Sequence, residues 1–527
     1  MSLQLLGIIL LTFLLRSLRG LLRFFYLAGD PVYHLLWAEK IRKNKFHYPK
    51  KVKNFLLPVL YNYPPLFHYL LAIFPKSTRE KLSPYFSAFI DTIHVAIIYF
   101  FTLYIIQTFQ FSNYISNPHL ISLVAALLFA TAPALLYYNW GIGPRAYSLT
   151  PRTLGELLMT LVFFNVIIWY CQGELWAFLL AGLFAGLALL TSKFSGQVLI
   201  FFSILLALFL KSPLFLVMPF LSILFALVLS KGYYYRVLVG WIKHSIFFKN
   251  VLAKNISVLT KRNNFSDFRN VLSGIIKRDF RKFAESLINI YSNNTYVILI
   301  TRNVLLIILL FFGFNYFHLI IQNKLLYFLV SWIFVSIIVF FITSLKPFLF
   351  LGEAERYLEY SIPAQVILFS FYYSFLNLDS LLSILLIYHG LFYIINMVML
   401  YLQFKISLPS INSKQELFSW FNQRNFDGKK VLAIPANYYE LIYGTDCAGL
   451  YPPANFTLIT KKLYESLWEE HEWHSRDIER LIKNYSIDLI VIQKQSLKSY
   501  ASKKGWHYNL EPYCKIFEND FYCVYAV

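Results

Sequence analysis

Charged residues are scarce in this chain. Asp, Glu, Lys and Arg make up 14% of its 527 residues, whereas soluble domains carry roughly 25%. That shortage excludes an ordinary soluble enzyme. The sequence also lacks a glycine-rich phosphate loop, a Walker pattern and a zinc-binding motif, and its four cysteines form no metal-ligand spacing. The common nucleotide-binding and zinc-dependent classes are therefore not indicated.

The apolar runs lack the polar–apolar alternation of a membrane β-barrel, and their continuity indicates a helical bundle instead. Hydrophobic residues make up 58% of the chain and aromatic residues 19%, which suits rings in lipid contacts and at the membrane interface. Most runs approach the roughly 20 residues that a bilayer requires. We predict a polytopic α-helical membrane protein with about eleven transmembrane helices and a small C-terminal α/β domain. The runs cover residues 3–15, 85–109, 117–139, 153–171, 175–191, 196–210, 213–230, 303–321, 325–345, 358–376 and 381–404. The first run is interpreted as a retained span, because no basic residue precedes it and no cleavage site follows.

Two long insertions interrupt these runs. Residues 24–84 are mostly polar and contain seven prolines, so they are too broken to span a membrane. Residues 231–302 are strongly basic and predict amphipathic helices at the membrane interface. From Lys405 the composition turns soluble, with short β-branched runs at 431–435 and 487–492, a charged helix at 465–484 and a closing run at 513–527. We therefore expect a transmembrane module over residues 1–404 and a soluble domain over 405–527.

The net charge of +21 is carried by loops between apolar runs, and no nucleic-acid-binding module is recognisable. Membrane lipids with anionic headgroups and phosphate-bearing lipids are the expected partners. An odd number of spans places Asp30, Lys193, Arg356 and the C-terminal domain on one side of the membrane. We interpret that side as extracytoplasmic, on a plasma (inner) membrane. The three arginines after the first run favour the cytoplasm instead, although the positive-inside rule weakens for loops near or above about 60 residues.

An acidic residue directly follows the first span. Asp30 stands in the segment Gly29-Asp30-Pro31-Val32-Tyr33-His34. A carboxylate beside aromatic residues at a membrane boundary loses solvation, which raises its basicity and suits it to act as a general base. The alternative is a helix N-cap, because Asp followed by Pro is a common helix start. Tyr63, in the aromatic and proline-rich stretch of residues 61–69, either lines a groove for sugar or lipid or belongs to an interfacial aromatic belt.

A second charged segment precedes the tenth predicted span. Arg356 offers a fixed fork of donors suited to a phosphate, and Tyr357 adds a hydroxyl. Glu355 could share this site, or pair with a neighbouring cation in a structural network. Arg152 and Lys193 add positive charge on the same predicted face, either as phosphate contacts or as helix-end cations that reach lipid headgroups.

Two further patterns remain open. His471 and His474 lie among glutamates, a metal-like composition that a solvated helix face also explains. If residues 517–520 form a two-residue hairpin turn, Cys514 faces Cys523, and the pair would form a disulfide in an oxidising compartment or remain as two free thiols.

The order of these segments resembles that of the GT-C superfamily of membrane glycosyltransferases, especially its protein O-mannosyltransferase-like and lipid A aminoarabinose transferase-like branch. The segments are Asp30 with His34, Tyr63-Pro64-Pro65, Thr150-Pro151-Arg152, Glu355-Arg356-Tyr357 and the C-terminal α/β domain.

This resemblance implies an inverting transferase that moves a sugar from a polyprenyl-phosphate donor to a glycan, lipid or protein acceptor on the extracytoplasmic face. Asp30 would then be the base, and Arg356, supported by Lys193 and Arg152, would bind the donor phosphate. Several relatives carry a second acid near the first, but Pro31 and Val32 stand there in this chain. We therefore predict no metal cofactor.

Two other functions fit the same features. A transporter or flippase of lipid-linked saccharides would recognise the same phosphate, but such proteins place ionisable residues near the bilayer midplane and often show paired repeats. The candidates within the runs are few: Asp91, His94, His318 and His389. An oligosaccharyltransferase or glycan polymerase would move a whole glycan and need a wider groove. A sugar-transfer assay with lipid-phosphate donors separates the three.

Overall fold

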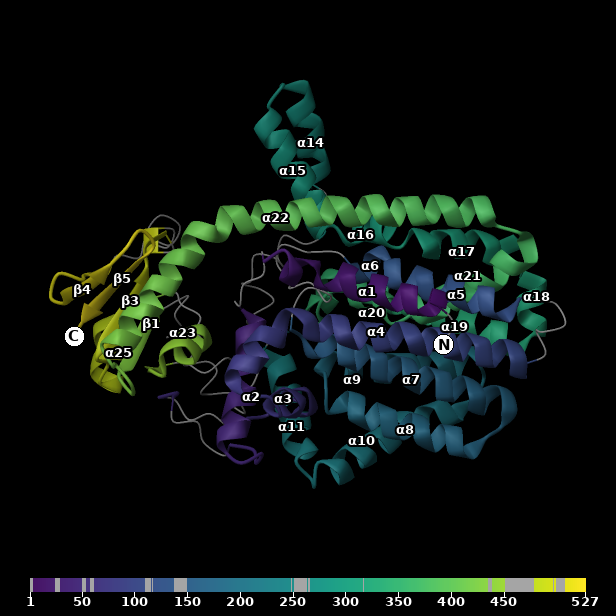
Figure 1. Cartoon of the computed structure of the whole chain (residues 1–527), viewed down its shortest axis with the longest axis horizontal. Helices are drawn as coiled ribbons and strands as arrows, with labels where there is room; N and C mark the ends of the chain where they lie inside the picture. Colours follow the sequence, from purple (N-terminus) through teal and green to yellow (C-terminus); the bar gives the residue numbers. More distant parts are fainter. Residues whose placement is uncertain are drawn as a thin grey trace. The chain divides into compact units, whose positions relative to one another are not determined.

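The computed structural model divides the chain into two compact units (Figure 1). One, the helical unit, comprises residues 1–23, 82–234 and 248–399, and the other, the α/β unit, comprises residues 24–81, 235–247 and 400–527. The loop after the first apolar run thus belongs to the same unit as the C-terminal segment. The structure describes residues 3–23, 29–49, 54–56, 61–109, 115, 117–136, 149–247, 249–250, 263, 266–315, 317–434, 438–450, 478–495, 497–498 and 508–527.

Six helices among the described residues are long and apolar enough to cross a membrane. They are α1 (Leu3–Leu21), α4 (Lys76–Thr108), α5 with α6 (Pro118–Thr131 and Pro133–Leu136), α7 (Pro151–Gln172), α19 (Lys324–Ser344) and α22 (Asp379–Gln423). A bent pair, α16 (Thr295–Arg302) and α17 (Val304–Asn315), adds a seventh if it forms one span, and its two parts meet at 78°.

Shorter apolar helices account for the remaining runs. They are α8 (Leu175–Leu189), α9 (Lys193–Phe209), η2 with α10 (Pro213–Val217 and Met218–Leu229) and α21 (Ile362–Leu376), and α18 (Phe317–Gln322) follows α17. Each of the eleven predicted runs overlaps one of these helices or pairs. The prediction of a polytopic helical protein is confirmed, while the number of eleven crossings stays a prediction.

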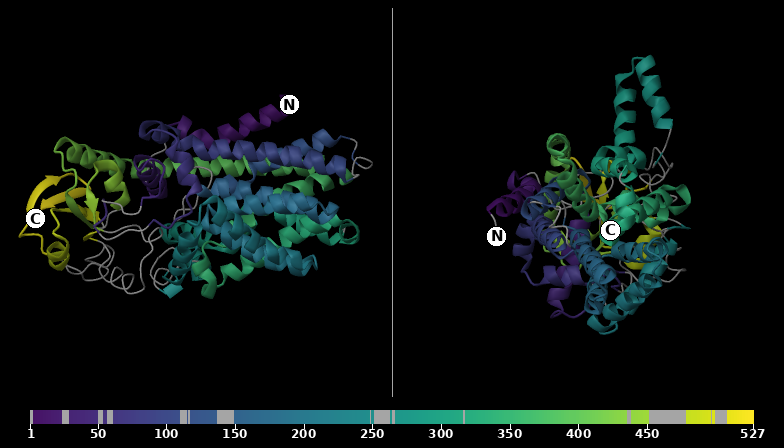
Figure 2. Two further views of the ribbon diagram at one scale, coloured as in Figure 1. Left: turned by 90° about the horizontal axis from the view of Figure 1, so that it is seen from below. Right: turned by 90° about the vertical axis from the view of Figure 1, so that its right-hand side faces the viewer.

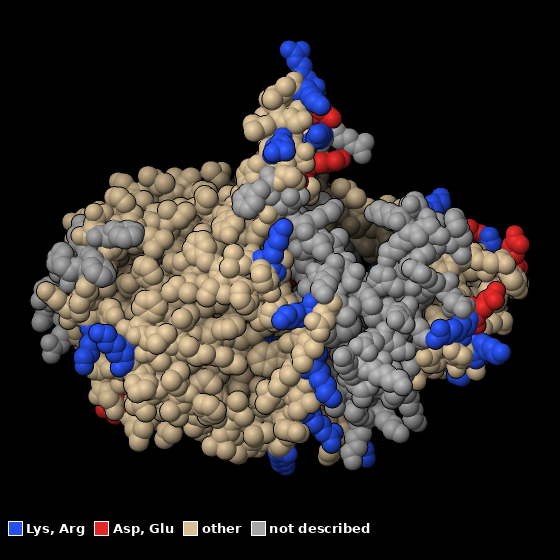
Figure 3. All heavy atoms as spheres, turned by 180° about the vertical axis from the view of Figure 1, so that it is seen from behind, with Lys and Arg blue, Asp and Glu red and all other residues tan. Residues whose placement is uncertain are grey.

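Close packing and an apolar exterior characterise the helical unit. Phe101 and Phe164 stack at 3.6 Å between ring centroids, and Phe163 lies 4.2 Å from Trp332. Outside, large apolar side chains such as Phe220 are exposed, and the face seen in Figure 3 carries few charged side chains over these helices. Apolar exposure on this scale is unusual for a soluble surface and suits contact with lipid.

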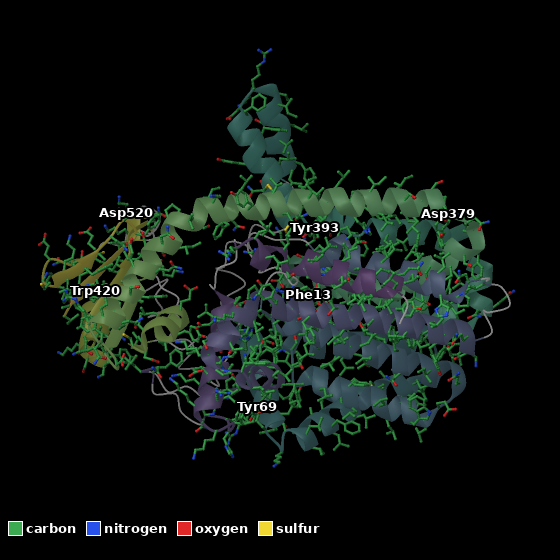
Figure 4. The ribbon with its side chains drawn as sticks, viewed as in Figure 1. Phe13, Tyr69, Asp379, Tyr393, Trp420 and Asp520 are labelled. Atoms are coloured by element: carbon green, nitrogen blue, oxygen red, sulfur yellow. The ribbon has the colours of Figure 1, made fainter. Side chains whose placement is uncertain are left out.

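A buried ion pair joins two helices of the helical unit. Arg16 of α1 and Asp91 of α4 are both fully buried and lie 3.4 Å apart, and Arg16 also donates to the carbonyl of Ala130 at the end of α5. The Tyr393 hydroxyl of α22 donates to the carbonyl of Leu15 at 3.0 Å (Figure 4). These contacts fix α1 to three other helices, and they place Arg16 inside the bundle, away from the boundary charges that the positive-inside rule counts.

The buried histidines of the helical unit also bridge helices. His94 shares a hydrogen bond of 2.9 Å with Thr160, and His389 shares one of 3.0 Å with Thr131. Three of the four residues considered for a transport path therefore join helix pairs. The side chain of His318 lies outside the described residues.

Part of the second insertion forms a helical hairpin within the helical unit. Its helices are α14 (Ser266–Ile276) and α15 (Phe280–Asn293). Figures 1 and 2 show the hairpin projecting from the bundle, across the direction of the long helices.

A five-stranded sheet forms the centre of the α/β unit. Its strand order is β2-β1-β3-β5-β4. The strands are β1 (Lys430–Ile434), β2 (Ala448–Gly449), β3 (Leu489–Gln493), β4 (Cys514–Glu518) and β5 (Tyr522–Ala526), with α23 (Tyr438–Thr445) and α25 (Ile478–Tyr485) between them. β1 pairs in parallel with β2 and β3, whereas β5 is antiparallel to β3 and β4. The predicted C-terminal α/β fold is confirmed.

The hairpin turn that would bring Cys514 opposite Cys523 lies elsewhere. The amide of Asn519 donates to the carbonyl of Tyr522 at 2.9 Å, so the turn spans residues 519–522. Cys514 therefore lies opposite Ala526, and Cys523 lies opposite Glu518. Both thiols are free, Cys514 exposed and Cys523 buried. Trp420 of α22 lies against this hairpin, 4.9 Å from the Phe517 ring (Figure 4).

The loop after α1 is joined to the sheet. Phe55 bridges Gly449 of the edge strand β2, and the amide of Leu56 donates to the carbonyl of Gly449 at 3.0 Å. The same loop contains α2 (Asp30–Lys43) and α3 (Leu66–Ala72). α11 (Tyr234–Phe247) contacts it through Gly240, because the space for a Cβ there is filled by Asn62. Segments distant in sequence thus form one unit around Asp30.

Candidate functional site

Two helix N-termini meet in the helical unit. Thr150 caps α7 by accepting from the amide of Arg152, and Ser192 caps α9 by accepting from the amide of Phe194. Gly155 permits the approach of the two helices, because a Cβ there would lie 2.6 Å from Ser195 Oγ. Unpaired amides and the helix dipole give such N-termini partial positive charge.

The short helix α20 (Glu355–Glu359) packs onto the start of α9. The Phe194 ring lies 4.6 Å from the Tyr357 ring, and Arg356 Cζ lies 5.5 Å from the same phenylalanine. Tyr357 donates to Gln197 at 3.2 Å, and Tyr360 and Ser195 share a hydrogen bond of 3.3 Å. Phe194 therefore contacts both an aromatic side chain of α20, Tyr357, and a basic one, Arg356.

The sequence-predicted residues of the helical unit gather at this contact. Arg152 and Glu156, one turn apart on α7, are buried and lie within electrostatic range of Tyr360. Lys193 begins α9, and the buried Glu355 begins α20. We call the set the mouth cluster: Arg152, Glu156, Lys193, Phe194, Ser195, Glu353, Glu355, Arg356, Tyr357, Glu359 and Tyr360.

The mouth cluster is not simply basic. Arg356 pairs with Glu353 at 2.5 Å, and the cluster contains three cations and four carboxylates. Two helix N-termini add positive partial charge at the same place. The ion pair with Glu353 holds Arg356 near the start of α9, an arrangement suited to an anionic ligand.

Asp30 lies in the α/β unit, at the start of α2. Asp30 is exposed, so the expected loss of solvation of its carboxylate is not observed. The N-cap of the helix is Gly29, with no side-chain cap. The N-cap alternative for Asp30 is therefore wrong: the carboxylate belongs to the first helical residue. Gly29 has φ +65° and ψ −140°, which favours glycine. Its amide donates to Glu440 Oε1 of α23 at 2.6 Å, and Glu440 in turn pairs with Lys414 at 2.5 Å.

A buried chain of polar rings lies on α2 and α3. His34 Nδ1 is 2.8 Å from His68 Nε2, and His68 Nδ1 is hydrogen-bonded to the Tyr61 hydroxyl. Tyr63 lies beside both imidazoles, 5.8 Å from His34 and 5.4 Å from His68 between ring centroids. The sequence-predicted His34 and Tyr63 thus lie in one aromatic cluster, which also contains Trp37, 4.4 Å from Tyr61.

Burial keeps both histidines neutral. Desolvation lowers the pKa of His34 to about 3, and burial together with the neighbouring His34 lowers the pKa of His68 well below its usual value. Neutral imidazoles can donate at one nitrogen and accept at the other, so the three rings form a directed hydrogen-bond chain.

The described residues contain no group of three His, Cys, Asp or Glu side chains arranged for a metal ion. Glu39, the spare carboxylate closest to Asp30 in sequence, pairs with Arg79 and Lys43. His471 and His474 lie outside the described part of the chain.

Three residues of the candidate site were not indicated by the sequence: Phe194, Ser195 and Glu440. The first two directly follow Lys193, whereas nothing local in the sequence relates Glu440 to Gly29.

No family model and no curated protein matches the sequence. Solved structures do match the fold. The archaeal oligosaccharyltransferase AglB from Archaeoglobus fulgidus, in complex with an inhibitory peptide and a dolichol-phosphate, superposes with a TM-score of 0.54 at 12% identity, over 99% of this chain and 74% of that one. The apo form of the Archaeoglobus fulgidus oligosaccharyltransferase has a TM-score of 0.54 at 14% identity, and the match covers 94% of this chain and 70% of that one. Its complex with Zn and sulfate has a TM-score of 0.53 at 13% identity, and the match covers 99% of this chain and 73% of that one. The chain therefore shares the fold of these oligosaccharyltransferase structures.

Proposed function

We propose that this chain is an inverting membrane glycosyltransferase that takes a sugar from a polyprenyl-phosphate donor at the extracytoplasmic face of a plasma (inner) membrane. The observation that carries the proposal is the mouth cluster, where Arg356, Lys193 and Arg152 meet two helix N-termini within a GT-C fold. This arrangement suits a phosphate that gains charge during the reaction. A structural neighbour with dolichol-phosphate supports a lipid-phosphate donor.

In the proposed reaction Asp30 takes the proton of the acceptor hydroxyl as the acceptor oxygen attacks the anomeric carbon of the sugar. The bond between that carbon and the phosphate oxygen breaks, and its electron pair leaves with the lipid phosphate. Arg356 stabilises the added negative charge, supported by Lys193 and Arg152, while Tyr357 and Glu355 hold α20 in place. A single displacement inverts the anomeric carbon.

His34 and Tyr63 have a less direct role in this proposal. Because the buried His34 of α2 lies against the partly buried Tyr63, we assign both to shaping the surface beside Asp30. No step requires a metal, since Glu39 is already paired.

A second candidate is transfer of a whole glycan to a peptide, as in an oligosaccharyltransferase. The observation in its favour is the fold of AglB, which is known with an inhibitory peptide and with a tethered acceptor peptide. Supplying donors that carry one sugar or an oligosaccharide, with a peptide or a lipid acceptor, separates the two candidates.

The donor assay tests the phosphate role. In proteoliposomes, Arg356→Ala should raise the apparent KM for a radiolabelled polyprenyl-phosphate sugar, because it removes a charge-assisted hydrogen-bond donor worth about 1.5–3 kcal/mol, or about ten- to a hundredfold. The matched control is Lys211→Ala, an exposed cation just beyond the opposite end of α9 from Lys193. An unchanged KM in Arg356→Ala would remove Arg356 from the phosphate site.

A further inference from the structure

The hairpin of α14 and α15 is a built element with a fixed turn. Asp279 caps α15 by accepting from the amide of Lys282 at 3.0 Å. Gly274 permits the two helices to touch, because a Cβ there would lie 2.9 Å from the backbone nitrogen of Phe283. The hairpin therefore has a defined geometry in the helical unit.

One stripe of α14 is apolar and exposed. Leu272, Ile275 and Ile276 recur at the spacing of a single helix face. Their exposed fractions are 62%, 59% and 80%, and Phe280, which begins α15, is 83% exposed. No residue in the described part of the chain covers this stripe, and an exposed apolar patch of this kind is typical of a surface that contacts a membrane or a partner.

The turn of the hairpin is strongly basic. Residues 276–282 contain four Lys or Arg and one acid, and that acid is the capping Asp279. Lys277 and Arg278 are exposed, and Figure 3 shows basic side chains along the projecting hairpin. Exposed apolar residues beside a group of cations are the composition of a surface that binds anionic membranes.

The base of the hairpin is fixed at the end of the bundle. Arg302 of α16 is buried, and its guanidinium donates to the carbonyl of Tyr291 on α15 at 3.4 Å. α16 lies at 78° to α17 and packs against α20 of the mouth cluster. Because ionisable side chains are costly at the centre of a bilayer, we place this charged end of the bundle at its boundary. The hairpin leaves the bundle at this level and extends across the direction of the long helices (Figures 1 and 2).

We propose that the hairpin of α14 and α15 lies in the plane of the bilayer interface, with its apolar stripe among lipid chains and its basic turn against anionic lipid phosphates. Three observations combine in this assignment: the uncovered stripe, the cations beside it and the level at which the hairpin leaves the bundle. The inference goes beyond the proposed sugar transfer and does not depend on it.

Depth measurements on the full chain test this placement. A nitroxide is attached to Ile276→Cys or Phe280→Cys in a chain whose four native cysteines are replaced by serine. The matched control is Glu285→Cys, an exposed polar position on α15 outside the apolar stripe. In vesicles of phosphatidylcholine with phosphatidylglycerol, oxygen should reach positions 276 and 280 better than a water-soluble nickel chelate does, and position 285 should show the reverse. Greater nickel access at 276 and 280 would overturn the proposal and leave the stripe available to a protein partner.

The basic turn is tested separately. Each cation near an anionic surface favours the bound state by about fivefold. Lys277→Gln with Arg278→Gln removes two of the four cations and should therefore lower the oxygen preference at position 276 in the anionic vesicles toward its value in phosphatidylcholine alone. Equal oxygen preference with and without the two cations would overturn the role of lipid phosphate.

Hydrogen exchange of the unmodified chain provides a measurement that depends on no substitution. Exchange of the amides in α14 should slow when phosphatidylglycerol is added to phosphatidylcholine, whereas exchange in β3, inside the sheet, should not change. Identical exchange of α14 in both lipids would contradict the proposal even if the cysteine-free chain fails to fold.

Discussion

Glu440 supports the residue next to the proposed base, and its removal should impair transfer more than binding. Its carboxylate is 5% exposed, accepts from the Gly29 amide at 2.6 Å and pairs with Lys414 at 2.5 Å. A hydrogen bond to a charged group contributes about 1.5–3 kcal/mol. Glu440→Ala should therefore destabilise the α/β unit by about 2–3 kcal/mol, since the half-exposed Lys414 can turn to solvent.

The larger effect is expected on catalysis. Gly29 directly precedes Asp30, and a displacement of about 1 Å in a reacting group can cost about a hundredfold in rate. In Glu440→Ala we expect kcat to fall by up to that factor while KM for the lipid-phosphate donor stays unchanged.

Two variants distinguish positioning from general destabilisation. Glu440→Gln retains an oxygen that accepts from Gly29, so it should recover most of kcat although the ion pair is lost. Glu416→Ala, an exposed carboxylate of the same unit that accepts from Asn519, should leave kcat unchanged. The assay combines steady-state transfer in proteoliposomes with thermal unfolding of each variant. An unchanged kcat in Glu440→Ala, or equal loss in the Ala and Gln variants, would refute the reasoning.

Two further predictions concern acid and metal. Burial lowers the pKa of His34 from 6.5 to about 3 and lowers the pKa of His68 as well. The unfolded chain therefore binds more protons than the folded one below pH 6.5, and stability should fall on acidification by up to about 1.4 kcal/mol per pH unit for each histidine. Unfolding temperatures measured against pH should show this fall, and His34→Gln should reduce its slope by about half; a fall of equal slope in the variant would contradict the assignment. Chelation with EDTA should leave sugar transfer intact, because the reaction is written without a metal; loss of activity that zinc or magnesium restores would show that a metal takes part.

Much of the fold could be predicted from local sequence. The apolar runs were located by composition and length alone, because a bilayer imposes the same length on every crossing. The two parallel strands β1 and β3 were located by their β-branched residues. The turn of the β4–β5 hairpin could not be located from the sequence, because moving a turn by two residues changes every cross-strand pair but keeps each side chain on the same face of the sheet.

The candidate site was predictable in part. Charge at the starts of α7, α9 and α20 indicated Arg152, Lys193 and Arg356, since ionisable residues at membrane boundaries are costly. The contact that supports Asp30 could not be foreseen. Gly29 and Glu440 are 411 residues apart in the chain, and only the folding of the first loop against the C-terminal sheet joins them.

Transfer by Asp30→Asn tests the central claim most directly. The variant keeps the size and hydrogen-bonding reach of the side chain but cannot take a proton from the acceptor. With purified full chain in proteoliposomes and radiolabelled polyprenyl-phosphate sugars, the wild type should transfer sugar, and Asp30→Asn should bind donor with unchanged affinity and transfer at least about a hundredfold more slowly. Transfer at the wild-type rate by Asp30→Asn would contradict the account.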